Sequence, residues 1–260
     1  MVTELEHDGR IELWLVSLAG IDAAIRREYE LLLAPAELTR AQRFLLPAPR
    51  DRYLTGRALL RTRLSLYTNV PEQNWLFAEN AHGRPYVVEP TEYRHVRFNL
   101  SHTNGLVACA FSAKHEIGVD IEETTRDRDF RGLASSYFAP REAADVRGRP
   151  AESQRAAFYS YWTLKEAYIK GRGMGLAIPL DSFWFDLKVD PPALRCTDRC
   201  ADDPTQWQFR QMLPTDRHQL AVGLRAAPGV PLDIRVRWAD DGPFAQSRAA
   251  AKAPGVISRS

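Results

Sequence analysis

The chain has 260 residues, 45% of them hydrophobic, and a formal net charge of +2. This length allows a substantial core in one large domain or two small ones, and the near-neutral charge argues against a nucleic-acid-binding protein. Residues 1–10 are polar and acidic and no apolar run approaches a membrane span, so we expect no secretory signal, no membrane partner and a cytoplasmic location.

The first part of the chain is predicted to contain a strand and two helices. Hydrophobic periodicity predicts a strand at 11–18 and helices at 21–33 and 51–66. Seven arginines fall within residues 40–63, where Asp51 is the only acidic residue. Because Arg57 and Arg61 are four apart, the second helix is expected to present a basic stripe, suited to phosphate, to nucleic acid or simply to solubility.

A loop at 81–85 and a hairpin at 96–111 lead to a predicted strand at 117–122, in which apolar and polar residues alternate. Alternation with a period of two is typical of a half-buried strand. The side expected to face a core carries Ile117, Val119 and Ile121. The opposite side carries Gly118, Asp120 and Glu122, and we expect Gly118 to leave open space beside the two carboxylates.

The next strong pattern is a predicted helix at 153–170, which contains an aromatic run and is expected to end at Gly171. Glu166 and Lys170 are four residues apart and therefore share one face of this helix. We expect a carboxylate and an ammonium to point together into a cleft beside the acidic strand.

Three converging carboxylates, those of Asp120, Glu122 and Glu166, require a positive partner. Each pair at about 4 Å repels by roughly 4 kcal/mol at an effective dielectric near 20. Magnesium suits a site of oxygen ligands, whereas zinc is disfavoured because neither stretch contains His or Cys. Taken singly, each pattern has a simpler explanation. Asp120 and Glu122 also suit the solvated face of a strand. Glu166 and Lys170 also suit a surface ion pair that stabilises the helix by roughly 0.3–0.5 kcal/mol.

The rest of the chain is predicted to follow a charged connector at 123–131. A helix is expected around 135–146, and strands near 182–189, 206–213, 220–225 and 232–238, before a flexible tail at 240–260. Cys109 lies in an apolar strand and is predicted to be a buried, reduced thiol. Cys196 and Cys200 lack the second ligand pair that a zinc site needs.

Four motifs together resemble a known family, the 4'-phosphopantetheinyl transferases, and specifically its surfactin-synthetase-activating (Sfp-like) type. They are FNLSH at 98–102, GVDIE at 118–122, WTLKEAYIK at 162–170, and GMGL at 173–176 running into PLDSF at 179–183. The resemblance spans roughly residues 40–225, and four motifs in the family's order are far more specific than any one of them.

This resemblance implies an α+β fold of two similar α/β halves, related by a pseudo-twofold axis, with the active site between them. The N-terminal half would be residues 1–116, with a coenzyme A-binding helix and the Ser-His hairpin. The C-terminal half would be residues 117–239, with the metal-binding strand and the catalytic helix. The family's larger single-chain members are often monomeric, so we expect a monomer.

The resemblance also implies a reaction. The family moves 4'-phosphopantetheine from coenzyme A to a serine of an apo acyl or peptidyl carrier protein, and releases adenosine 3',5'-bisphosphate. Mg²⁺, or Mn²⁺ in its place, would be held by Asp120, Glu122 and Glu166, while Lys170 would contact the pyrophosphate. Glu166 is the first candidate for general base, with Glu122 and a metal-bound water as alternatives.

The resemblance implies contacts with coenzyme A for Ser101, His102, Arg84 and Lys165. It implies them less firmly for Arg43 and Arg52. From the residues alone, His102 also suits a structural histidine that caps the hairpin. Lys165 points about 100° away from Glu166 and therefore lies at the rim or merely covers the helix. Tyr137 and Phe138 resemble an aromatic region that the family uses near the carrier protein, although core aromatics fit equally well.

Two other functions remain open. One is a non-catalytic coenzyme A- or carrier-binding homologue, which the presence of all three carboxylates and Lys170 disfavours. The other is a nucleic-acid-binding protein that uses the arginine-rich helix, which the near-neutral charge disfavours.

Overall fold

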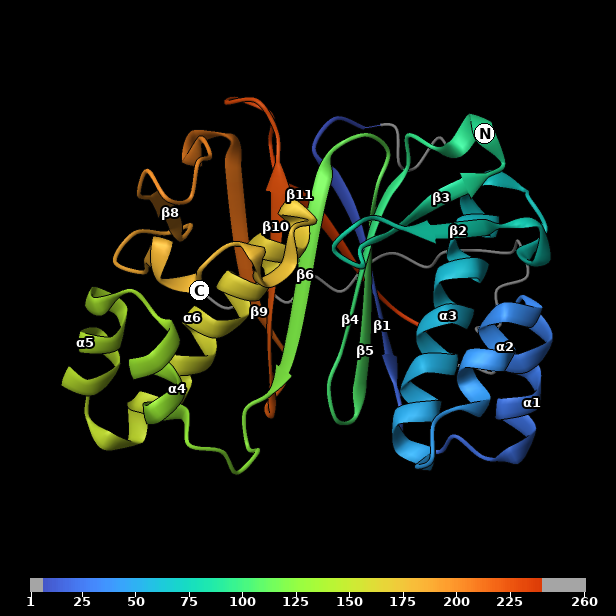
Figure 1. Cartoon of the computed structure of the whole chain (residues 1–260), viewed down its shortest axis with the longest axis horizontal. Coiled ribbons are helices and arrows are strands. Elements are labelled where there is room, and N and C mark those ends of the chain that lie inside the picture. The colour runs from blue at the N-terminus through green and yellow to red at the C-terminus, as the bar shows by residue number, and fades with distance from the viewer. Residues whose placement is uncertain (1–6, 240–260) are drawn as a thin grey trace.

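Two β-sheets lie side by side through the middle of the molecule in the computed structural model, which describes residues 7–239 (Figure 1). The tail expected at 240–260 lies outside the described residues. The strand orders are β11-β1-β5-β4 and β6-β10-β9. The first sheet consists of β1 (Arg10–Ser17), β4 (Arg97–His102), β5 (Leu106–Ser112) and β11 (Asp233–Trp238). The second consists of β6 (Glu116–Glu123), β9 (Trp207–Thr215) and β10 (His218–Arg225).

Helices cover the outer side of each sheet (Figure 1). Beside the first sheet lie α1 (Ala23–Leu32), α2 (Pro35–Gln42) and α3 (Pro47–Thr68). Beside the second lie α4 (Phe130–Tyr137), α5 (Pro140–Gly148) and α6 (Ala151–Arg172). Three of these helices, α2, α3 and α5, begin at a proline, which loses no helical hydrogen bond in a first turn.

Two short hairpins complete the described chain. One consists of β2 (Leu76–Glu79) and β3 (Pro85–Glu89), and the other of β7 (Phe183–Asp186) and β8 (Ala193–Cys196). Each of them pairs antiparallel strands. The first hairpin belongs to the side of α3, and the second to the side of α6 (Figure 1).

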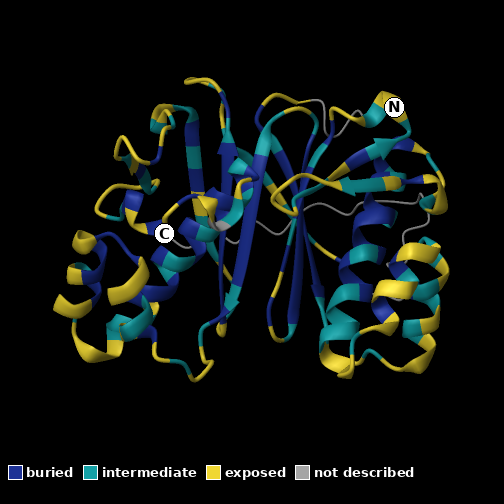
Figure 2. Cartoon of the chain, in the orientation of Figure 1, coloured by how far each residue is buried: buried dark blue, intermediate teal, exposed yellow. Residues whose placement is uncertain are grey.

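Three hydrophobic clusters hold these layers together. One packs α1–α3 on the outer face of the first sheet, through residues such as Leu60 and Cys109. A second fills the space between the two sheets, where Leu13 and Ala108 of one sheet are clustered with Val119 and Val222 of the other. The third packs α4–α6 on the second sheet. Figure 2 shows the result: the central strands are largely buried, while the helices are exposed on their outer faces.

Side chains join the facing edges of the two sheets. The amide groups of Val119, Ile121 and Glu123 on β6 donate to two side chains within β4 and to one that directly follows it. Their acceptors are Asn99 Oδ1 at 2.9 Å, Ser101 Oγ at 3.3 Å and Thr103 Oγ1 at 3.0 Å. Because alternate residues of a strand point to the same side, three polar residues spaced by two supply these bonds. The joint brings Ser101 beside the acidic strand.

Most predicted elements are confirmed within a few residues, and two corrections have physical causes. The helix expected at 135–146 is two helices, because the chain is extended at Phe138 and Ala139, just before Pro140. The last long helix ends at Arg172, and Gly173 rather than Gly171 takes the left-handed conformation, with a φ of 66°. The short elements α2, β2, β3 and β8 were not predicted.

The basic stripe expected on α3 is wrong. Arg57 and Arg61 both form ion pairs with Glu37 of α2, and the Arg61 side chain is only 1% exposed. Arg50 is paired with Glu30 of α1 at 2.7 Å. These arginines therefore fasten α3 to its neighbouring helices instead of forming a free cationic surface.

The α+β class is confirmed by the matched layers of sheet and helix. One strand does not follow the expected division of the chain after residue 116. It is β11, from the C-terminal part, which pairs in parallel with β1. The C-terminal strand thus belongs to the sheet of the N-terminal half. The division into two halves stays a prediction.

Candidate functional site

The site begins at a close approach between β6 and α6. The apolar side chains of β6 face the other sheet, as predicted, and the opposite face of the strand meets α6. A Cβ atom at Gly118 would overlap the carbonyl oxygen of Ala167. The expectation of open space beside Gly118 is therefore wrong, since the glycine lets the helix backbone lie directly on the strand.

This contact brings charged residues of three elements together. Lys170 Nζ on α6 donates to Asp120 Oδ1 on β6 at 2.6 Å and to Ser101 Oγ on β4 at 2.9 Å. The Ser101 hydroxyl donates to the same carboxylate oxygen at 2.9 Å. Ser101 also accepts the Ile121 amide, so all of its hydrogen-bonding groups are in use at the joint between the sheets.

Glu122 and Glu166 lie close enough to Asp120 to affect its electrostatic environment and to be affected by it. Burial raises the pKa of Glu166 to about 7; Lys170 opposes this rise, and the charges of Asp120 and Glu122 add to it. Burial and the charge of Asp120 also raise the pKa of Glu122, against the influence of Arg128. The charge of Asp120 therefore disfavours ionisation of both Glu122 and Glu166.

The chemistry of these donors fits a hard divalent cation. Asp120 Oδ2 is buried and has no hydrogen-bond partner among the described residues, an arrangement that costs free energy unless something else satisfies the oxygen. Within residues 7–239, no three His, Cys, Asp or Glu side chains are arranged as a group that could hold a metal ion. Magnesium commonly binds through only one or two carboxylates together with substrate phosphates, so an open donor set is compatible with it.

The residues expected to contact coenzyme A fall into two groups. His102 is exposed at the end of β4; partial desolvation lowers its pKa, as do the charges of Lys170 and Arg52. Arg52 on α3 therefore lies within electrostatic reach of the cluster. Arg43 is exposed at the end of α2.

Arg84 and Lys165 have other contacts. Arg84 Nη1 donates to the carbonyl oxygen of Gly171 at 2.8 Å and pairs with Glu116 at 2.5 Å, which ties the β2–β3 hairpin to the end of α6. Lys165 is fully buried, and its ammonium contacts Glu142 at 2.6 Å and the Leu180 carbonyl at 2.8 Å. The prediction that Lys165 contacts coenzyme A is wrong, because its side chain points into the core.

Sequence reasoning missed several residues that position the site. Asn99 and Thr103 join β4 to β6, and Thr103 Oγ1 also lies 3.4 Å from Glu122 Oε2. Their spacing of two from Ser101 was a readable signal. Arg128, whose guanidinium lies 3.7 Å from Glu122, comes from the connector and carries no such pattern.

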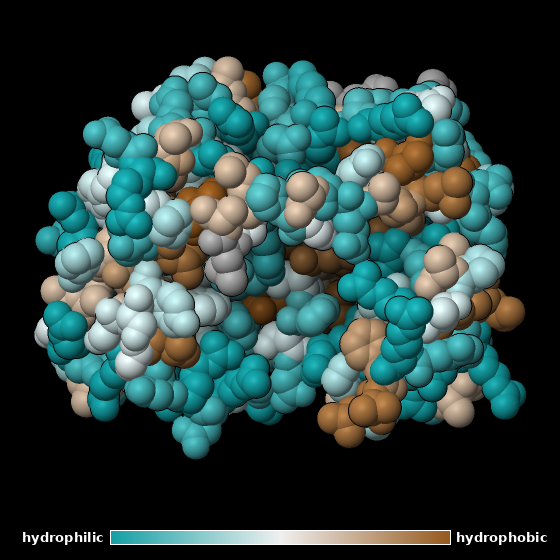
Figure 3. Space-filling view, viewed as in Figure 1, coloured by the Kyte–Doolittle hydropathy of each residue, from teal (hydrophilic) through white to brown (hydrophobic). Residues whose placement is uncertain are grey.

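The surroundings separate core aromatics from exposed ones. Phe138 stacks on Phe158 in the core, while Tyr137 is half exposed. Figure 3 shows the face of the molecule hollowed near its centre, between the two helical sides. Over residues 7–239, no helix has both the length and the apolar character needed to cross a membrane.

Comparison with known proteins relates both parts of the chain to one family. Residues 116–223 match a family model described as the 4'-phosphopantetheinyl transferase superfamily, and residues 24–114 match one described as 4'-phosphopantetheinyl transferase, N-terminal. The chain is 31% identical to the 4'-phosphopantetheinyl transferase HetI of Nostoc sp. over 82% of this chain and 87% of that protein. It is 37% identical to the transferase gsp of Aneurinibacillus migulanus, over 52% and 54% of the two chains. It is 30% identical to the transferase Sfp of Bacillus subtilis, over 61% and 68%.

Proposed function

The chain belongs to the 4'-phosphopantetheinyl transferase superfamily and is a transferase of that kind, and on this premise we propose that it modifies apo carrier proteins with the phosphopantetheine of coenzyme A. The acceptor would be a serine of an acyl or peptidyl carrier protein. The four sequence motifs favour the surfactin-synthetase-activating type. Identities of 31% to HetI and 30% to Sfp do not separate the subtypes.

One observation carries the proposal: Asp120, Glu166 and Lys170 meet where β6 and α6 touch, beside Ser101. In the reaction, the serine oxygen attacks the β-phosphorus of coenzyme A while the bond to the bridging pyrophosphate oxygen breaks. The serine proton passes to a base, and adenosine 3',5'-bisphosphate leaves. Positioning and charge neutralisation supply most of the catalysis in such displacements.

Lys170 supplies a fixed positive charge at this point. Burial alone would lower its pKa, but the charges of Asp120 and Glu166 outweigh burial and raise it. The ammonium therefore stays protonated and can bind a pyrophosphate oxygen as a point charge. Its bond to Ser101 sets its direction, at the edge shared by the two sheets.

Asp120, Glu122 and Glu166 would hold the divalent cation, magnesium or manganese. When bound, such a cation offsets charge on the pyrophosphate and on the leaving group. The buried Asp120 oxygen without a hydrogen bond supports this assignment, as do the raised pKa values of Glu122 and Glu166.

Glu166 is the preferred general base. A base works best when its pKa is close to the working pH, and in the metal-free protein burial places the pKa of Glu166 at about 7. Above that pH the carboxylate is free to accept the serine proton. Glu122, whose pKa is also raised, is the alternative within the protein.

Polar and cationic residues near the cluster suit the phosphates of coenzyme A. We assign to this role His102, which lies within electrostatic reach of Arg52 and Lys170 and can donate an imidazole N–H, together with Arg52 itself and, as a further contact, the exposed Arg43. We expect a monomer that acts in the cytoplasm, a compartment that suits its three free cysteines.

An intact-mass assay tests the proposal. The protein is incubated with coenzyme A, magnesium and an apo peptidyl carrier domain, with and without chelator. A gain of one phosphopantetheine on the carrier that disappears with chelator is the expected result. No gain on several unrelated carriers, while coenzyme A still binds, would instead support a non-catalytic homologue.

A further inference from the structure

Two of the three cysteines lie next to each other at the end of β8. Cys196 ends the strand, Cys200 follows one turn later, and the Cys196 thiol donates to Cys200 Sγ at 3.1 Å. Both are free thiols. Cys109 lies on β5 of the first sheet, fully buried, and provides an internal comparison.

The surroundings of the pair make its two thiols unequal. The Tyr168 hydroxyl lies 3.1 Å from Cys200 Sγ, and Arg172 Nη1 donates to that hydroxyl at 2.8 Å and to the Cys200 carbonyl at 3.3 Å. The hydrogen bond from Cys196, followed by the contact with Tyr168 and the charge of Arg172, lowers the pKa of Cys200. The same pairing raises the pKa of Cys196. Cys200 is therefore the thiol that ionises first, and ionised thiols are the nucleophiles.

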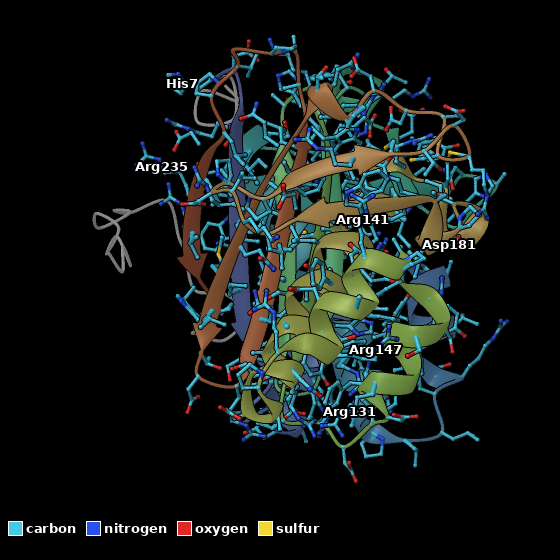
Figure 4. All side chains as sticks on the ribbon, turned by 90° about the vertical axis from the view of Figure 1, so that its left-hand side faces the viewer. His7, Arg131, Arg141, Arg147, Asp181 and Arg235 are labelled. Atoms are coloured by element: carbon cyan, nitrogen blue, oxygen red, sulfur yellow. The ribbon has the colours of Figure 1, made fainter. Side chains whose placement is uncertain are left out.

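The pair also lies close to the surface. Cys196 is half-buried, whereas Cys200 is only 3% exposed. Between them Arg199 forms an exposed ion pair with Asp181 at 3.2 Å, and Figure 4 shows Asp181 at the edge of the molecule. The two thiols therefore lie beneath the exposed residues 197–199, and Cys196 is the more accessible of them.

We propose that Cys196 and Cys200 are a redox modification site that hydrogen peroxide closes into an intramolecular disulfide. The Cys200 thiolate attacks the peroxide, the O–O bond breaks, and the Cys200 sulfenic acid forms with release of one water. The Cys196 thiol then attacks that sulfur and a second water leaves, so two thiols are oxidised as the peroxide is reduced. The sulfurs, 3.1 Å apart, must approach by about 1 Å to reach the bond length of about 2.05 Å.

The site is connected to the helix that carries Lys170. Tyr168 and Arg172, which contact Cys200, lie on α6 at positions on either side of Lys170. Closing the disulfide removes the thiolate that these two side chains face, so it changes the contacts of the last turns of α6. The proposal does not depend on the transferase reaction, since its test reads a covalent bond.

Peptide mapping tests the proposal on the whole protein. Trypsin cleaves after Arg195, Arg199 and Arg210, so it places the two cysteines on separate peptides, residues 196–199 and 200–210. After treatment with hydrogen peroxide and alkylation, we expect these two peptides to be joined and then separated by dithiothreitol. We also expect the loss of two of the three titratable thiols, with Cys109 alkylated only after denaturation.

The variants are designed to leave a readable result in every case. Cys109→Ser, the matched control, should keep the linked peptide, whereas Cys196→Ser should abolish it and leave a sulfenic acid on Cys200 that dimedone traps. Three alkylatable thiols after peroxide treatment of the unmodified protein would overturn the proposal. So would sulfinic acid at Cys200 without linkage, or a bond between two chains on a non-reducing gel.

Discussion

Asp120 is the residue at which β4, β6 and α6 meet. One of its oxygens accepts hydrogen bonds from both Ser101 and Lys170, and the other is buried without a partner among the described residues. A buried carboxylate oxygen without a hydrogen bond is unfavourable unless a cation or donor is supplied. We therefore expect Asp120 to be the first ligand of the divalent cation.

Replacing Asp120 by Asn tests this assignment. The amide keeps the shape but loses the negative charge, so the magnesium concentration for half-maximal transfer should rise by about tenfold or more. Excess magnesium should restore part of the rate. A titration of carrier modification against magnesium measures the effect, and full activity of the variant at low magnesium would remove Asp120 from the metal site.

The raised pKa of Glu166 predicts that the stability of the metal-free protein, measured in the presence of chelator, depends on pH. A folded-state pKa raised to about 7 means that folding opposes ionisation of this carboxyl. The group therefore costs stability as pH rises from the unfolded value of 4.5 through about 7. Glu166→Gln, which cannot ionise, should match the unmodified protein at pH 5 and exceed its stability at pH 8.

Urea unfolding at the two pH values measures this difference. Glu152→Gln, at the exposed start of α6, is the matched control and should not gain stability between pH 5 and pH 8, because a carboxylate in the first turn of a helix is favourable. Magnesium should reduce the advantage of Glu166→Gln, because a cation stabilises the carboxylate. An equal stability difference at pH 5 and pH 8 would be incompatible with a raised pKa.

Replacing His102 by Ala tests whether this residue contacts coenzyme A or has only a structural role. It is exposed at the end of β4, near Arg52 and Lys170. His102→Ala should chiefly raise the KM for coenzyme A and leave unfolding unchanged, because its loss opens no core. His95→Ala, at another exposed histidine, is the control. An unchanged KM would return His102 to a structural role.

At the scale of elements, the contact of β6 with α6 depends on Gly118. A Cβ atom there meets helix backbone, which cannot move aside as a flexible side chain can. Gly118→Ala should therefore reduce the free energy of unfolding by about 1–3 kcal/mol or more and lower the transfer rate. Gly148→Ala, at the open end of α5, has no neighbour to meet and should be neutral or slightly stabilising. Equal unfolding curves for the two variants would show that the contact is not tight.

The sequence predicted the elements of the site better than its contacts. Alternation in residues 117–122 and the four-residue spacing of Glu166 and Lys170 were sufficient to place the acidic strand and the helix correctly. The inward direction of Lys165 was not predicted, because its burial depends on Glu142 and on carbonyl groups of another segment. Gly118 was misread for a similar reason, since a strand pattern does not show which backbone will approach it.

Over the whole molecule, the site lies where the two sheets are joined. A shared hydrophobic cluster fills the space between the sheets, and side chains of β4 bond to the amide groups of β6. The family resemblance predicted a site between two halves. It did not predict that β11 returns to the first sheet, because parallel pairing of distant strands leaves no local pattern in the sequence.

We propose that the carboxylates and the lysine at the β6–α6 contact carry out phosphopantetheine transfer. The most direct measurement is the single-turnover rate of carrier modification at saturating coenzyme A and magnesium, for Glu166→Gln against Glu152→Gln on the same helix. We predict a loss of about 100-fold or more for Glu166→Gln and an unchanged rate for Glu152→Gln. Equal rates for the two variants would contradict the account.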